Sequence, residues 1–104
     1  MSKDPFKAVL TEAGGRLALK MSGELTLEGE DALMAAFQGV TLTGRPPLVL
    51  DFAAVPYVNS AGITVLLGLI QGLRDKSGEI SFTGLNKHIE KVFKMTGFSN
   101  LVKF

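Results

Sequence analysis

The residues that could do chemistry in this sequence are few, and the most suggestive of them lie in one short stretch. Asp51 lies near the end of a nearly continuous apolar run, 48–52, and Asn59-Ser60-Ala61-Gly62 begins a long apolar segment shortly afterwards. Asn59 predicts a helix start, because an asparagine side chain can accept a backbone N–H of the first turn. The Ser60 hydroxyl would lie near free N–H groups, where a phosphate is stabilised. Ser60 is thus either part of a cap or a site of modification.

A hydrolytic triad could be imagined from Ser60, His88 and Asp51. The glycine-serine-glycine elbow typical of hydrolases is absent, however, and no motif positions a base. We interpret Asp51 as a loop anchor and His88 as an exposed neighbour of Lys87 and Lys91. We therefore expect the protein not to be an enzyme.

The composition argues against several other kinds of site. The chain has 104 residues, and we expect a single domain over residues 1–104. It has no cysteine and one histidine, so we expect no metal centre and no cofactor. Lys plus Arg is 11 and Asp plus Glu is 10, so the chain lacks the basic excess that predicts a nucleic-acid partner.

The hydropathy pattern indicates the cellular compartment in which the protein is expected. The most apolar stretch, Ile63 to Ile70, is far shorter than the roughly 20 residues of a membrane span. The first six residues, Met1 to Phe6, lack the apolar core of a signal peptide. We therefore expect a cytoplasmic protein with no direct membrane insertion.

Glycine and proline divide the chain into alternating strands and helices. Residues 6–13 and 16–22, joined by Gly14-Gly15, are typical of a β-hairpin. The elements expected after the hairpin are a helix following Glu28, a strand at 48–52, a loop at 53–59, a helix from about 60 to 76, a strand at 79–83, a helix between Asn86 and Gly97, and a last strand or tail at 101–104. This order predicts an α/β fold, with helices packed on a mixed sheet of four to five strands.

Several short motifs follow one another along nearly the whole chain, from about Phe6 to Phe104. They are Gly23-Glu-Leu25, Asp51-Phe-x-x-Val55, Val58-Asn-Ser-Ala-Gly62, Ser77-Gly78-Glu79 and Val92-Phe-Lys-Met-Thr-Gly-Phe98. In this order and at this spacing they resemble the STAS domain family, and most closely the bacterial anti-sigma factor antagonists. The resemblance implies a STAS-like fold for the chain.

The resemblance also implies a partner-switching function. The unphosphorylated form would bind an anti-sigma factor that is also a serine kinase, and so release a sigma factor. The kinase would phosphorylate the serine at the helix start and end the binding, and a serine phosphatase would restore it. Carried over by motif, the phosphoacceptor is Ser60. The expected partner-binding residues are Glu24, Thr26, Tyr57, Asn59, Ser60, Ala61, Gly62, Thr64, Val65 and Gly68.

Two positions depart from the family pattern. The family usually has Asp before the phosphoacceptor, where this chain has Asn59, and often an acidic residue after Gly-Glu-Leu, where it has Thr26. Both departures remove negative charge near Ser60. They leave open an alternative, a regulatory or scaffold STAS subunit of a membrane transport complex that does not depend on phosphorylation.

The helix after Ser60 has more apolar surface than one core face requires. The residues expected to face the sheet are Ile63, Leu66, Leu67 and Ile70. The opposite side would gather Ala61, Val65, Gly68 and Gly72, with Leu69 at its edge. Glycine in a helix costs about 1 kcal/mol relative to alanine. This stripe is either a docking surface continuous with Ser60, or a face that another helix or the terminus covers.

Overall fold

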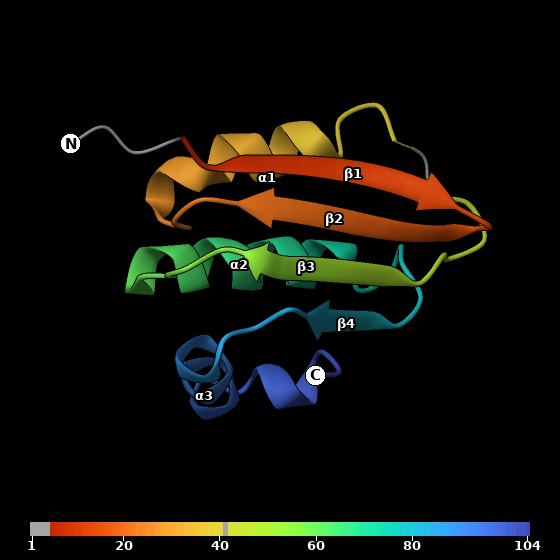
Figure 1. Ribbon diagram of the computed structural model, residues 1–104. Coiled ribbons are helices and arrows are strands. Elements are labelled where there is room, and N and C mark those ends of the chain that lie inside the picture. Colours follow the sequence, from red (N-terminus) through yellow and green to blue (C-terminus); the bar gives the residue numbers. More distant parts are fainter. Residues whose placement is uncertain (1–4, 41) are drawn as a thin grey trace.

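The computed structural model describes residues 5–40 and 42–104, in which one sheet carries helices on one of its faces (Figure 1). Residues 1–4 and Thr41, which the single-domain prediction includes, lie outside the described residues. The elements in chain order are β1 (Lys7–Ala13), β2 (Arg16–Ser22), the 3₁₀ turn η1 (Leu27–Gly29), α1 (Glu30–Ala36), β3 (Leu48–Ala54), α2 (Ser60–Leu73), β4 (Ile80–Thr83), α3 (Lys87–Met95) and the 3₁₀ turn η2 (Phe98–Asn100).

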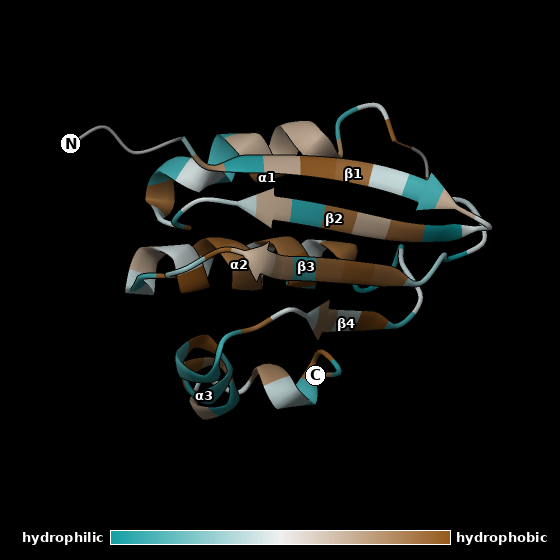
Figure 2. Ribbon diagram, in the orientation of Figure 1, coloured by the Kyte–Doolittle hydropathy of each residue, from teal (hydrophilic) through white to brown (hydrophobic). Residues whose placement is uncertain are grey.

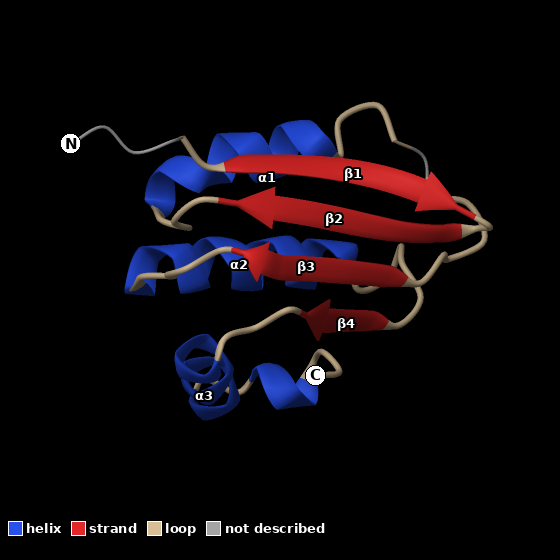
Figure 3. Cartoon of the chain, viewed as in Figure 1, coloured by secondary structure: helices blue, strands red, loops and turns tan. Residues whose placement is uncertain are grey.

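The four strands lie side by side in the order β1-β2-β3-β4. β1 and β2 form the expected antiparallel hairpin, and Gly14 and Gly15 supply the positive φ angles, 61° and 79°, of its tight turn. β2, β3 and β4 are parallel. Crossovers between parallel strands are right-handed, and both crossovers step the same way across the sheet, so α1 and α2 lie on the same face. Figure 3 shows both helices behind the strands.

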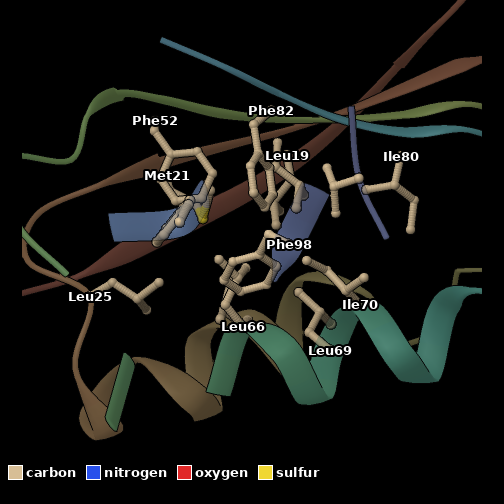
Figure 4. Close-up of a cluster of buried hydrophobic side chains, with 14 of the residues drawn as sticks. Leu19, Met21, Leu25, Phe52, Leu66, Leu69, Ile70, Ile80, Phe82 and Phe98 are labelled. Atoms are coloured by element: carbon tan, nitrogen blue, oxygen red, sulfur yellow. The ribbon is translucent and has the colours of Figure 1, made fainter. Parts of the chain in front are cut away.

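Alternation along the strands separates a buried face from an open one. Leu50 and Phe52 of β3 are buried toward the helices, whereas Asp51 between them is half-exposed on the other face. The close-up in Figure 4 shows Leu66, Leu69 and Ile70 of α2 pointing into a cluster with the strand residues. Figure 2 shows the same division: most of α2 is hydrophobic, whereas α3 carries many hydrophilic positions.

An aromatic cluster fixes α3 at the β4 edge of the sheet. Phe93 of α3 lies 5.5 Å from Phe52 and 4.9 Å from Phe98, measured between ring centroids. Phe82 of β4 packs edge-on against Phe52 and Phe98. Buried aromatic pairs in such geometries add to the stability gained from area burial. This end of the molecule is therefore closed by large side chains.

The chain after η2 returns to the sheet without adding a fifth strand. The structure has one bridge there, between Ser81 and Lys103, in place of a strand at 101–104. Lys103 donates its N–H to the Ile80 carbonyl at 2.9 Å and accepts from Phe82 N–H at 2.7 Å. Its side chain lies 2.9 Å from Glu79, whose hydrogen bond and negative charge raise the pKa of Lys103 above its ordinary value.

Two element boundaries differ from the prediction by more than one residue. α2 ends at Leu73 rather than near residue 76, because the chain turns over residues 74–76 and the Ser77 side chain donates to the Leu73 carbonyl at 3.1 Å. β3 continues to Ala54 because its last residues still pair with the end of β2. Within the described residues, no helix is long and apolar enough to cross a membrane.

Candidate functional site

Two segments far apart in sequence run side by side beyond the ends of β2 and β3. The Gly23 N–H bonds to the Ala54 carbonyl at 3.0 Å, and the Leu25 N–H to the Tyr57 carbonyl at 3.0 Å. The Asn59 N–H then bonds to the Leu25 carbonyl at 3.2 Å. This parallel extension carries the Gly-Glu-Leu segment to the start of α2. Two of the predicted motifs therefore meet at one end of the sheet.

The start of α2 has the predicted cap. The Asn59 side-chain oxygen accepts the Gly62 N–H at 2.7 Å, and the Asn59 carbonyl accepts the Ile63 N–H at 2.9 Å. Ser60 is the first residue of the helix and is exposed. The Thr64 hydroxyl donates to the Ser60 carbonyl at 3.2 Å, one turn along. Because Asn59 provides the cap, the Ser60 side chain is not needed for it.

Gly62 is closely packed against the parallel extension. It is buried, and a Cβ there would overlap the carbonyl oxygen of Leu25 and come within 3.1 Å of the Val58 side chain. Contact of Gly62 with a partner stays a prediction. The missing side chain lets the first turn of α2 approach the parallel extension, which sets the position of Ser60.

The other predicted residues at this end remain accessible. Tyr57 is 45% exposed, and Glu24 and Thr26 are half-exposed. The Thr26 hydroxyl accepts the Glu28 N–H at 3.3 Å and so caps η1. Thr26 therefore starts a helical turn where the family often has an acidic side chain.

The stripe on α2 is only partly open. Val65, predicted to lie on the exposed side, is 8% exposed, and Leu69 is also buried. Both line the cleft between α2 and α1, so the alternative that another helix covers the stripe is right for these positions. Ile63 and Leu67, expected to face the sheet, are half-buried. The buried face of α2 is thus turned toward α1. A helical-wheel projection of α2 alone cannot predict this rotation, because it does not show where α1 packs.

The open part of the stripe contains the two glycines. Gly68 and Gly72 are exposed, and a Cβ added at either would meet no heavy atom within 4 Å. The opposite wall is formed by Leu27 of η1 and Met34 of α1, which sequence reasoning missed. The sequence signal that could have indicated this wall is the spacing of Leu27 and Met34, two apolar residues seven apart on either side of an acidic first helical turn.

The structure does not assemble the imagined hydrolytic triad. The Asp51 carboxylate accepts the Ala53 N–H at 2.9 Å, which makes it the expected loop anchor. In the described part of the chain, no hydrogen bond joins Asp51 to His88 or Ser60. His88 is exposed on α3. Residues 5–40 and 42–104 also contain no group of three or more His, Cys, Asp or Glu that could hold a metal ion.

Comparison with known proteins agrees with this geometry. Residues 8–103 match the family described as "Mlab, STAS domain", and the chain belongs to this STAS domain family. It is 27% identical over 96 residues to BtrV of Bordetella bronchiseptica, which is named as a candidate anti-sigma factor antagonist, covering 92% of this chain and 83% of that protein.

Solved structures show the same fold. An anti-sigma factor antagonist from Mycobacterium paratuberculosis aligns with a TM-score of 0.74 and 21% identity, over 94% of this chain and 83% of that one. The Bacillus cell fate determinant SpoIIAA in its phosphorylated form aligns with a TM-score of 0.66 and 18% identity, over 91% and 87% of the two chains. These likenesses confirm the predicted α/β fold, and of the predicted four to five strands the described residues form four.

Proposed function

We propose that this chain is an anti-sigma factor antagonist that works by binding and is switched at Ser60. Its unphosphorylated form binds an anti-sigma factor that is also a serine kinase. Phosphorylation of Ser60 by that kinase ends the binding, and a serine phosphatase restores it. BtrV, similar over nearly the whole chain, carries the name of this class of regulator.

The observation that carries the proposal is the placement of Ser60. It is exposed at the first position of a 14-residue helix whose cap is made by its neighbour Asn59. Its side chain can therefore enter the active site of another protein without loss of the cap. The free N–H groups and the dipole at this helix end can also stabilise the product phosphate.

The physical basis of release is local. A phosphate adds about −1.5 to −2 charges at a surface that would be in contact with the partner. The kinase active site that receives Ser60 would still hold nucleotide phosphates, which repel the new group. Losing about 3 kcal/mol would weaken binding more than a hundredfold. No large change in the fold is required, because the phosphate attaches to an exposed side chain.

The test compares wild-type protein with Ser60→Asp and Ser60→Ala. We expect wild type to capture an ATP-binding serine kinase from lysate of its source organism, and Ser60→Asp to lose it by about a hundredfold. Purified kinase and ATP should phosphorylate wild type but not Ser60→Ala. Ser99→Asp is the matched control, since Ser99 is exposed in η2.

The outcomes separate the proposal from its alternative. Phosphorylation of Ser60→Ala to the wild-type extent would refute the assignment of Ser60. Equal capture of transport-complex subunits by wild type and Ser60→Asp would favour the scaffold function, which the departures at Asn59 and Thr26 left open. Circular dichroism of each variant checks that binding changes do not reflect unfolding.

A further inference from the structure

The cleft between α1 and α2 is an apolar groove of about 470 Å³ that begins beside Ser60. Leu27 and Met34 form one wall, and they are 63% and 62% exposed although both are large apolar side chains. Ala61 and Gly68 form the other wall, and Val65 lies between the walls. Exposed apolar side chains that gather along a hollow mark interaction sites more often than single exposed ones do.

The charges around the groove are of one sign. Glu30 lines it, and the exposed Glu28 and Asp31 are its near neighbours in sequence, in η1 and α1. The elements that supply the walls, η1, α1 and α2, hold three acidic residues, Glu28, Glu30 and Asp31, and no Lys or Arg. A chain of net charge +1 therefore presents a local negative field here.

The dimensions of the groove suit a helix. Ala61 and Gly68 are seven residues apart on α2, and Leu27 of η1 and Met34 of α1 form the wall that faces them. Seven residues of helix rise about 10 Å, which is the span of anchor side chains at i, i+4 and i+7 on a docked amphipathic helix. The basic helix α3 of a second copy is unsuited, because its own apolar residues Ile89 and Phe93 are buried in the core.

We propose that the α1–α2 groove binds a basic amphipathic helix of a protein partner, with apolar anchors in the groove and Lys or Arg beside Glu28, Glu30 and Asp31. The proposal rests on the proposed function in that this partner is the anti-sigma factor. The groove provides affinity and orientation, and the phosphorylated residue acts one turn away at Ser60. Attraction at the groove and repulsion at Ser60 thus act on different parts of the partner.

The test uses a fluorescein-labelled helical peptide of about 16 residues, with leucines at i, i+4, i+7 and i+11 and lysines on either side. Fluorescence anisotropy measures its affinity, and amide shifts of ¹⁵N-labelled protein locate its site. Gly68→Leu should fill the groove and weaken binding by about tenfold or more. Gly72→Leu is the matched control, since it lies one turn further along outside the groove. Both variants should fold, because neither position has a neighbour that a Cβ would meet.

We expect shifts in α1 and the first half of α2, an affinity that falls as salt screens the acidic residues, and no binding of a peptide with Glu in place of Lys. Equal weakening by the two leucine variants, shifts confined to other elements, or no binding at millimolar peptide would overturn the groove assignment. The assay contains no kinase, so its failure leaves the Ser60 switch standing. Failure of the Ser60 variants with intact peptide binding would refute the switch alone.

Discussion

The two ends of the helical layer are built in opposite ways. Around α3, five phenylalanines contact one another with centroid distances between 4.9 and 5.5 Å. Between α1 and α2, the lining includes the exposed Gly68, Leu27 and Met34 and the half-buried Ala61, and the surface is hollow. The α3 end carries the exposed Lys87, Lys91 and Lys94, whereas the charged residue that lines the groove is Glu30.

The difference separates the part of the molecule that stabilises the fold from the part that is available to a partner. Large rings in close contact bury apolar area and leave no room for a ligand. Glycines in a helix lower its stability but keep a face flat and open. The α1–α2 side therefore gives up stability that the α3 end does not.

The largest expected effect is at the α3 end. Phe93→Ala should lower the free energy of unfolding by about 3–5 kcal/mol, because it leaves a cavity among fully buried rings. Urea denaturation measures this effect. A loss below about 1 kcal/mol would mean that the aromatic cluster does not hold the fold together. Met95→Ala, at an exposed position on the same helix, is the control.

The second prediction tests whether the glycines of α2 differ in their effect on stability. Gly62→Ala should destabilise the protein by about 2 kcal/mol or more, because its Cβ would overlap the Leu25 carbonyl and displace the helix start. Faster hydrogen exchange of the Asn59 amide in the variant than in wild type, measured by NMR, would locate the damage at the parallel extension. An increase in stability would show that the close approach at Gly62 is not real.

The smallest effect has the opposite sign. Gly72→Ala should raise the free energy of unfolding by about 0.5–1 kcal/mol, since alanine orders the helix and meets no neighbour. Gly68→Ala should stabilise by a similar amount, and thermal unfolding measures both. A destabilised Gly68→Ala would indicate that this glycine is required for packing, which would end its interpretation as an open binding position.

Much of the fold could be predicted because local signals agreed with one another. Gly14-Gly15 specifies a turn, the Asn59 cap a helix start and the apolar runs strands, and these are confirmed. The structure of residues 101–104 was harder to predict. Their single bridge to Ser81 depends on the position at which η2 ends relative to β4. That position is set by tertiary contacts rather than by the residues of the tail.

The position of the candidate site could be predicted from the sequence, but the burial of its individual residues could not. The motifs place Ser60 and Asn59 at the helix start, and the structure confirms that they lie there. The sequence does not say which neighbour faces each side of α2, so Val65 and Gly62 were assigned to the surface although both are buried. Leu27 and Met34 could not be predicted as groove residues, because the groove that they line forms only when α1 packs against α2.

The hydrogen bonds between Gly23–Leu25 and Tyr57–Asn59 have a consequence for the order in which the protein folds. The surface around Ser60 exists only after a loop of more than thirty residues, from Leu25 to Asn59, has closed. Closing such a loop precedes any gain from the contacts it permits. A chain misfolded in β3 therefore cannot form this surface, so the proposed binding at Ser60 would be restricted to correctly folded molecules.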